Sequence, residues 1–337
     1  MLIATRFGLG IRDPAWFEHR AFLLSSITAP SLLAQDDHRF EWVVFVDAGL
    51  PEEVRVKLEG TLAPFEGRAY MDSGGHQAEN LLDIAVRQEL VSADGYVLTG
   101  RIDDDDAWDR RTINSVRDRI AAWRNNGAPT RGFCMTFKSG LVWIMYDMLD
   151  VHRFQKDGSK VICEASVRPY TYPFTSISGF VYARLSDRLT SISTGHPVLG
   201  DFLAERGFSV ESLATDQPMW LYCRHKQTTS PIRRSVEANT VDWTLVDLEG
   251  RFGIDATGAQ QYITNAYSYY YSQIGHWEYR SKVRIELKEM ARKIADPRTS
   301  DIEAAALRHE HRMLSERLED LSKKVTSDLK DTGELQV

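Results

Sequence analysis

The sequence is poor in cysteine and has no long hydrophobic run. Its three cysteines, Cys134, Cys163 and Cys223, are far apart and form no CxxC pair. An odd and sparse set argues against a disulfide framework and is typical of reduced thiols in the cytoplasm. No apolar stretch approaches the roughly 18 residues of a membrane-spanning helix, and the first residues lack the basic segment and apolar core of a signal peptide. We expect a cytoplasmic protein without a transmembrane segment, with contact at the inner face of a membrane left open.

Two nucleotide-binding signatures and an excess of positive charge are also missing. No glycine-rich loop leads into Lys-Ser or Lys-Thr, which excludes a P-loop, and Gly8-Leu9-Gly10 lacks the third glycine of a dinucleotide fingerprint. Lysine and arginine number 41 against 48 aspartates and glutamates, so nucleic acid is not an expected partner. Hydrophobic residues make up 43% and charged residues 26% of the chain, a balance typical of globular proteins.

Residues 1–110 alternate between strand-like and helix-like segments. Short β-branched or aromatic runs indicate strands, and apolar residues with a period of about 3.6 indicate helices. The order predicts an α/β fold, with a mostly parallel sheet and helices on both faces. The expected strands are Leu2–Phe7, Phe40–Asp47, Arg68–Met71 and Tyr96–Ile102, and the expected helices are Trp16–Gln35 with a break near Pro30, Pro51–Leu62 and Gln77–Leu90.

Residues 111–278 are expected to form the second half of the same domain, and this half is suited to binding the acceptor. A helix is expected over Arg110–Asn125, followed by short antiparallel strands and turns, including Lys138-Ser139-Gly140, and by short helices at His196–Arg206 and Ser212–Trp220. Aromatic side chains here either stack on sugar faces or, more commonly, pack in the core. They include Trp143, Tyr170, Tyr172 and Phe174.

Residues 279–330 have apolar side chains at helical spacing on both sides of Pro297, which predicts a C-terminal α-helical hairpin. Such a hairpin buries its apolar stripe on the main domain or against a second copy of the chain, so a homo-oligomer stays open.

Four consecutive aspartates, Asp103 to Asp106, follow the strand Tyr96–Ile102 directly. Two like charges about 4 Å apart repel by roughly 4 kcal/mol at an effective dielectric constant near 20, so these carboxylates must protonate, spread into water or bind a cation. Open α/β sheets bind ligands at the carboxyl ends of their strands, and oxygen ligands suit Mg²⁺ or Mn²⁺. The strand Phe40–Asp47 also ends in a carboxylate, which suggests a shared ligand edge. The alternative is a solvated acidic turn before a helix.

An ordered set of segments resembles the rhamnosyltransferase family of GT-A-type glycosyltransferases. The run Asp103-x-Asp105-Asp106 matches the DxD motif, which is short and weak by itself, but the resemblance covers roughly residues 1–230. The matching segments are Thr5-Arg6-Phe7 with Trp16 and Arg20, Ile27–Gln35, Trp42–Asp47, Thr99–Ala107, and Asp216–Leu221 followed by His225.

The resemblance implies a GT-A-like fold and transfer of a sugar from a nucleotide-sugar donor, with Mn²⁺ or Mg²⁺ at the diphosphate. Such an ion stabilises the charge that develops on the leaving nucleoside diphosphate. The resemblance also allows dTDP-rhamnose as the donor and a glycan, lipopolysaccharide or another molecule as the acceptor. By the family pattern, Asp105 is a metal ligand, and His225 is a metal ligand or contacts the diphosphate, although a lone histidine is more often a core or surface residue.

The resemblance also implies a set of residues around the nucleotide-sugar. Asp103 faces the ribose, and Asp106 contacts the metal or the donor sugar. Asp104, at the variable position of the run, is expected to point away, and the register of the four aspartates stays open by one residue. Arg6, Arg101 and Asp47 lie at the expected donor edge. Ion pairing is an equal alternative for the two arginines, and a strand-ending turn is the alternative for Asp47.

Asp216 is the candidate general base of an inverting transfer, in which a carboxylate takes the proton of the acceptor hydroxyl. Glu211 is the second choice, and a helix cap is the structural alternative for Asp216.

Two other functions stay open at this point. Clustered aspartates also hold the ions of metal-dependent phosphodiesterases and nucleases, which need further ligands on other strand ends. A non-catalytic carbohydrate-binding protein with the same fold is the other alternative, and assays of donor hydrolysis with and without Mn²⁺ separate the three.

Overall fold

The computed structural model describes residues 1–11, 13–127, 131–145, 166–171, 178–195, 198–225 and 241–262, and single positions or short stretches between 287 and 315. The chain divides into two units, Met1–Gln261 and Tyr262–Val337. In the second unit, residues 290–295 are helical. The hairpin expected over 279–330 otherwise lies mostly outside the described residues and stays a prediction, and Cys163, Tyr172 and Phe174 lie outside them as well.

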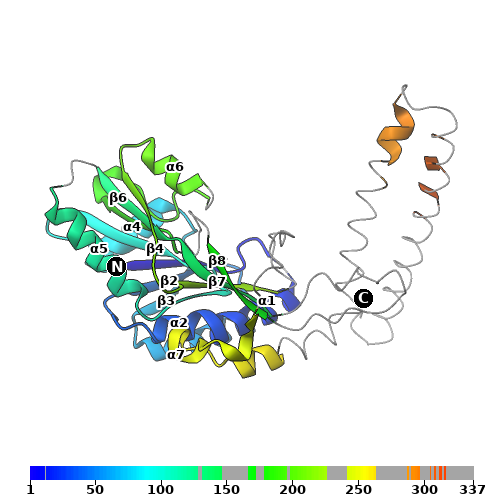
Figure 1. Ribbon diagram of the computed structural model, residues 1–337, viewed down its shortest axis with the longest axis horizontal. Helices are drawn as coiled ribbons and strands as arrows, with labels where there is room; N and C mark the ends of the chain where they lie inside the picture. Colours follow the sequence, from blue (N-terminus) through cyan, green and yellow to red (C-terminus); the bar gives the residue numbers. More distant parts are fainter. Residues whose placement is uncertain are drawn as a thin grey trace. The chain divides into compact units, whose positions relative to one another are not determined.

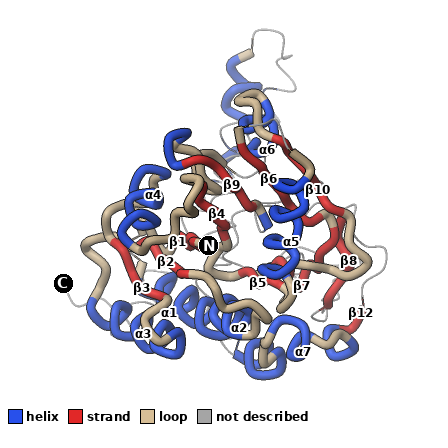
Figure 2. The backbone as a smooth tube through the Cα atoms, turned by 90° about the vertical axis from the view of Figure 1, so that its left-hand side faces the viewer, coloured by secondary structure: helices blue, strands red, loops and turns tan. Residues whose placement is uncertain are grey.

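The larger sheet of the first unit has seven strands in the order β10-β6-β9-β4-β1-β2-β3. Figure 1 labels β2, β3, β4 and β6 of this sheet, and Figure 2 labels the others as well. Six of them run parallel and β9 runs antiparallel to both of its neighbours, β4 and β6. This confirms the mostly parallel α/β sheet. The strands are β1 (Leu2–Arg6), β2 (Glu41–Phe45), β3 (Ala69–Asp72), β4 (Tyr96–Arg101), β6 (Gly132–Phe137), β9 (Phe180–Arg184) and β10 (Ser209–Leu213).

Helices cover both faces of this sheet because its strands are apolar on both sides. On β1, Ile3 joins the core formed with α1 (Pro14–Leu23), α2 (Ala29–Leu33), α3 (Glu52–Leu62) and α5 (Thr112–Asn125). Its neighbour Leu2 joins the core under α4 (Ala78–Arg87), and a third cluster packs α6 (Leu199–Ala204) on β6 and β9. In Figure 2, α1, α2 and α3 lie below β1 to β3 and α4 lies above them.

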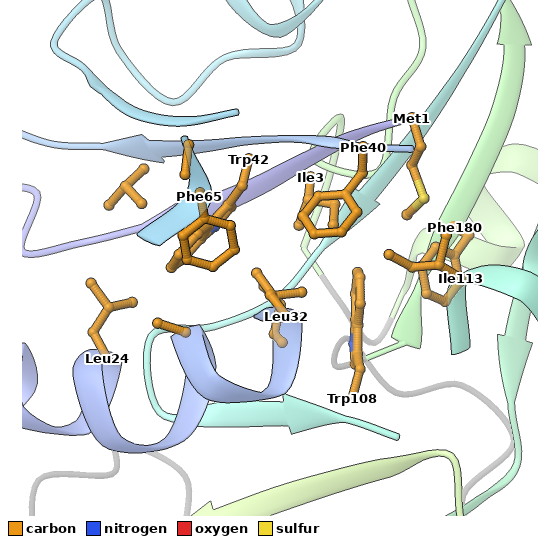
Figure 3. Close-up of a cluster of buried hydrophobic side chains, with 14 of the residues drawn as sticks. Met1, Ile3, Leu24, Leu32, Phe40, Trp42, Phe65, Trp108, Ile113 and Phe180 are labelled. Carbon is orange, nitrogen blue, oxygen red and sulfur yellow. The ribbon is translucent and has the colours of Figure 1, made fainter. Parts of the chain in front are cut away.

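The larger core is rich in aromatic side chains. Figure 3 shows Trp42 and Ile3 pointing from the sheet toward Leu24 and Leu32 on the helical layer. Trp42 also donates a hydrogen bond from Nε1 to Thr5 Oγ1 at 2.9 Å, and Thr5 in turn donates to the backbone oxygen of Ile102 at 2.9 Å. The core thus fixes the point at which β4 ends and the aspartate run begins.

A smaller five-stranded sheet has the order β12-β8-β7-β11-β5. Its strands are β5 (Asp106–Trp108), β7 (Ser139–Ile144), β8 (Ser166–Thr171), β11 (Trp220–Arg224) and β12 (Val241–Asp242), and α7 (Leu248–Phe252) follows them. The chain leaves the large sheet at the end of β4 and enters the small sheet at β5. The aspartates therefore lie at the junction of the two sheets.

Two predictions for residues 111–278 are wrong. Ser212–Trp220 is no helix, because β10 reaches Leu213 in register with β6 and β11 begins at Trp220 in register with β5. Gly140 lies inside β7 and not in a turn, with only Lys138 between β6 and β7. In both places, pairing with strands far away in the sequence overrides the local preference.

The predicted break in Trp16–Gln35 lies just before Pro30, as one turn of π-helix over Leu24–Thr28 between α1 and α2. Pro30 has no amide hydrogen and its ring crowds the carbonyl four residues earlier, so a wider turn relieves the helix. Ala29 accordingly donates its amide hydrogen to Leu24, five residues back. The wider turn brings Thr28 Oγ1 to the backbone oxygens of Asp103 (3.2 Å) and Asp106 (2.9 Å).

Candidate functional site

The four aspartates have different surroundings. Asp103 keeps 30% of its side chain exposed and pairs with Arg101 Nη2 at 3.3 Å. Asp104 and Asp105 are buried, and Asp106 is completely inaccessible to solvent. Asp106 Oδ1 accepts the amide hydrogen of Cys223 at 3.2 Å, while its Oδ2 has no hydrogen-bond partner among the described residues.

Arg20 is the main counter-charge of the run. From α1 its buried guanidinium donates to Asp104 through Nε at 3.0 Å and through Nη2, and to Asp105 Oδ2 through Nη1 at 2.6 Å. Burial opposes the charge of Arg20, yet the two carboxylates hold its pKa above the usual value. A planar guanidinium can bridge two carboxylates in this way, whereas a lysine ammonium has no such fork.

His225 enters the same cluster from the end of β11. Its Nε2 lies 2.9 Å from Asp105 Oδ2 and 3.0 Å from Arg20 Nη1, and its Nδ1 lies 3.1 Å from His19 Nε2. Burial lowers the pKa of His19 to about 2 and lowers the pKa of His225 as well, so both rings are neutral near pH 7.

A neutral His225 has one N–H, and each of its two tautomers satisfies two of these three contacts. With the proton on Nε2, His225 donates to Asp105 and accepts from His19. With the proton on Nδ1, it donates to His19, and its bare Nε2 accepts from Arg20. The second tautomer is the one that a metal ligand requires, because it leaves the Nε2 lone pair directed at a cation.

The carboxylates differ in their titration. Burial raises the pKa of Asp104 to about 6 against the attraction of Arg20, and raises the pKa of Asp106 well above its usual value with the help of Asp105. Burial also opposes ionisation of Asp105, but Arg20 and then His225 bring its pKa below the usual value. Asp105 is therefore the carboxylate of the buried part that stays ionised most readily.

Three other candidates lie at the carboxyl ends of the parallel strands. Arg6, the last residue of β1, is exposed. Arg101, the last residue of β4, is buried, and its pKa is lowered by that burial despite the nearby Asp103. Asp47 follows β2 and accepts the amide hydrogen of Gly10 at 2.8 Å, which ties this edge to the loop between β1 and α1. The structure thus brings the predicted donor residues to one edge of the sheet.

Comparison with known families agrees with this arrangement. A family model described as "Putative rhamnosyl transferase" matches residues 10–234, which is more than half of the chain. The chain belongs to this rhamnosyl transferase family. Membership favours a transferase over the phosphodiesterase or nuclease alternative. No curated protein matches the sequence.

Solved structures similar to this rhamnosyl transferase family member include TarS of S. aureus. TarS 1–349 in complex with UDP-GlcNAc has a TM-score of 0.34 and 10% identity, covering 68% of this chain and 61% of that one. TarS 1–349 alone has a TM-score of 0.35 and 12% identity, with 66% and 60% covered. HddC from Yersinia pseudotuberculosis has a TM-score of 0.29 and 9% identity, with 64% and 90% covered. This chain therefore matches less than two thirds of TarS 1–349.

In this rhamnosyl transferase family member, the two candidate base residues lie outside the aspartate cluster, on β10 and in the loop that follows it. Asp216 is exposed in the loop between β10 and β11 and makes no hydrogen bond or ion pair with the described residues. It caps no helix, since the predicted helix is a strand–loop–strand segment. Glu211 instead forms a two-pronged ion pair with Arg119 of α5 at 2.7 and 2.5 Å, which gives it a structural role.

The aromatic candidates that are described belong to the core. Trp143 is fully buried, with its ring 6.2 Å from that of Trp243, and Tyr170 packs edge-on against Trp220 at 6.0 Å. Trp143 therefore has no exposed face of the kind that sugar stacking needs, whereas Tyr170 is half-buried.

The sequence analysis did not identify His19 as a site residue, and it listed Arg20 only as part of the family pattern. Both lie on α1, about 80 residues or more before their partners in the chain. No local pattern identifies them, although a histidine and an arginine that fall on the buried side of a helix are a signal of buried polar contacts.

A divalent ion fits this site in part. The set contains one ionised carboxylate oxygen and one neutral imidazole nitrogen 2.9 Å apart, close to the separation of adjacent ligands around an ion with bonds of about 2.1 Å. No group of three or more ligating side chains is arranged for an ion among the described residues. Asp105 and His225 would thus supply two ligands, and the other positions fall to water and to donor oxygens.

No helix in the described part of this family member is long and apolar enough to cross a membrane.

Proposed function

We propose that this protein is a metal-dependent glycosyltransferase that moves a sugar, with rhamnose as the first candidate, from a nucleoside diphosphate donor to a hydroxyl group of an acceptor. The observation that carries the proposal is the meeting of Asp105 with His225 at the carboxyl edge of the parallel sheet, 120 positions apart in the chain. Family membership and the position of this edge support it.

In this proposal, Asp105 and His225 hold Mn²⁺ or Mg²⁺. When bound, the ion neutralises the charge that grows on the leaving diphosphate. Arg6 lies exposed at the end of β1 and is proposed to bind the diphosphate, and Arg101 is proposed to orient Asp103 through their 3.3 Å ion pair. Asp103 and Asp47 are proposed to accept hydrogen bonds from ribose or base.

We propose Asp216 as the general base of an inverting transfer. Its carboxylate is exposed and has no partner among the described residues, so it can accept the proton of an acceptor hydroxyl. Glu211 cannot do so without losing its ion pair with Arg119. The proposed acceptor is a glycan or lipopolysaccharide, met in the cytoplasm or at the inner face of a membrane.

The test combines donor turnover with nucleotide binding. Candidate nucleotide-sugars, dTDP-rhamnose among them, are first ranked by thermal shift in the presence of Mn²⁺. Asp105→Asn should then reduce turnover of the best donor by about a thousandfold, the scale of lost transition-state charge stabilisation. Calorimetry should find the nucleoside diphosphate bound much more tightly by the wild type with Mn²⁺ than with chelator.

Asp83→Asn is the matched control, because it removes one exposed carboxylate from α4, outside the site. It should leave turnover unchanged. Turnover of Asp105→Asn near the wild-type rate would refute the role of Asp105, and a folded wild type that turns over no donor would favour the carbohydrate-binding alternative.

A further inference from the structure

A positive charge already lies beside Asp105 Oδ2 and His225 Nε2, the two atoms that define the edge between Asp105 and His225. Arg20 Nη1 lies 2.6 Å from Asp105 Oδ2 and 3.0 Å from His225 Nε2, and these two atoms are 2.9 Å apart. The three atoms form a nearly equilateral triangle. The guanidinium nitrogen thus faces the same carboxylate oxygen and the same imidazole nitrogen that the proposed ion needs.

The imidazole makes the two cations exclusive. A neutral histidine has a single lone pair, which lies in the plane of the ring. An ion bound to Nε2 must occupy the direction in which that lone pair points, and in the Nδ1-protonated tautomer Nε2 uses the lone pair to accept a hydrogen bond from Arg20 Nη1. Two positive charges sharing one carboxylate oxygen would also repel each other strongly in a buried site.

Asp104 gives Arg20 a second anchor. Nε and Nη2 of Arg20 bind the two oxygens of Asp104, and this contact involves neither Asp105 nor His225. The guanidinium can therefore release Nη1 from Asp105 and still keep a buried carboxylate as its partner. Asp104, at the variable position of the aspartate run, therefore has the role of anchoring Arg20.

We infer that Arg20 and the divalent ion are alternative occupants of the edge between Asp105 and His225, with Arg20 holding the site when no ion is bound. Arg20 is then a positioning residue that holds Asp105 in an ion pair and limits metal affinity. The inference rests on the proposed function for the identity of the ion site, but its test measures metal binding and not sugar transfer.

The experiment compares two double variants of the full chain by titration with Mn²⁺ alone, followed by calorimetry. Arg20→Gln/Asp104→Asn removes the competing pair without changing the net charge, and Asp105 keeps its contact with His225. It should bind Mn²⁺ about tenfold more tightly than the wild type, or better, which corresponds to 1.4 kcal/mol or more. Arg101→Gln/Asp103→Asn is the matched control, because it removes an ion pair from the same run and leaves the triangle intact.

Circular dichroism and thermal unfolding test whether each variant is folded. If the Arg20→Gln/Asp104→Asn variant is not folded, Arg20→Lys replaces it in the titration. A lysine keeps the charge but loses the fork, so Arg20→Lys should also bind Mn²⁺ more tightly than the wild type. Equal or weaker Mn²⁺ binding in the folded Arg20 variants, or an equal gain in the control, would overturn the inference.

The outcomes separate this inference from the proposed function. If the wild type binds Mn²⁺ and requires it for turnover but the Arg20 variants gain nothing, the function stands and the inference fails. If the wild type turns over donor in chelator and only the Arg20 variants bind Mn²⁺, the inference stands and the metal dependence fails. If no variant binds Mn²⁺, both fail.

Discussion

At the scale of single residues, the aspartate run is stable because each carboxylate meets a different partner. Asp103 is partly exposed to water and pairs with Arg101. Asp104 and Asp105 share Arg20, whereas the pKa of Asp106 is raised mainly by burial. Four charged neighbours in one environment would repel. The fold divides them between solvent, a counter-ion and protonation, and Asp105 stays ionised beside a neutral His225.

Asp37 provides a residue-scale prediction outside the site. It accepts hydrogen bonds from Arg39 Nε at 2.9 Å and Nη2 at 2.6 Å, and these bonds are the main reason that its pKa is lowered to about 2. A folded pKa below the unfolded value of about 3.9 stabilises the native state above pH 4 by about 2 kcal/mol, and this contribution is lost as the pH falls toward 2.

Asp37→Asn should therefore lower the free energy of unfolding by about 2 kcal/mol at pH 7, as measured by urea denaturation. The difference from the wild type should narrow between pH 4 and pH 2.5. A difference that is the same at pH 7 and pH 2.5 would contradict the ion-pair explanation.

At the scale of elements, the small sheet depends on a glycine that the sequence pattern suggests is a turn residue. A Cβ atom at Gly140 on β7 would lie 2.0 Å from the indole ring of Trp220 on β11. Trp220 is fully buried and donates from Nε1 to the backbone oxygen of Phe137 at 2.8 Å, so it cannot move aside easily. The strand that leads into His225 therefore packs the indole ring of Trp220 directly on the backbone of Gly140.

Gly140→Ala should destabilise the protein by about 1 to 3 kcal/mol, the usual cost of overpacking. Gly60→Ala is the matched control, since Gly60 lies within α3 with open space around it. It should stabilise by about 0.5 to 1 kcal/mol through helix propensity. Thermal unfolding of the two variants tests this, and equal effects would mean that the Trp220 contact is unimportant.

At the scale of the whole molecule, every site residue belongs to the first unit. Asp105, His225 and Arg20 are held between α1, the end of β4 and the end of β11, all of which lie before residue 261. The second unit begins at Tyr262. The boundary at residue 279 and the role of residues 279–330 in assembly are our proposals.

A chain ending at residue 278 should fold and bind nucleoside diphosphate with Mn²⁺ as the full chain does. Its mass in light scattering should change if residues 279–330 join two copies of the chain. Calorimetry and light scattering on both chains test this division. A truncated chain that is folded but binds no nucleotide would mean that the second unit contributes to the donor site.

The sequence by itself determined the parallel strands, because β1, β2 and β4 are short and mainly apolar runs whose burial on both faces requires covering helices. It also determined that the aspartates follow β4, since an apolar run cannot continue through four carboxylates. The Ser212–Trp220 helix was wrong and Gly140 was assigned to a turn, because β10, β7 and β11 are stabilised by partners distant in the sequence.

Only the tertiary structure decided which groups meet the aspartates. His225 was expected there from the family pattern, but His19 and Arg20 arrive on α1, whose own sequence shows no reason for burying an arginine. Pro30 predicted a break in this helix, but the π-helical form of the break and the contact of Thr28 with the run have no local signature. Charge compensation in a buried site depends on distances between side chains, and those distances are set by how α1 packs on the sheet, which the order of residues along the chain does not record.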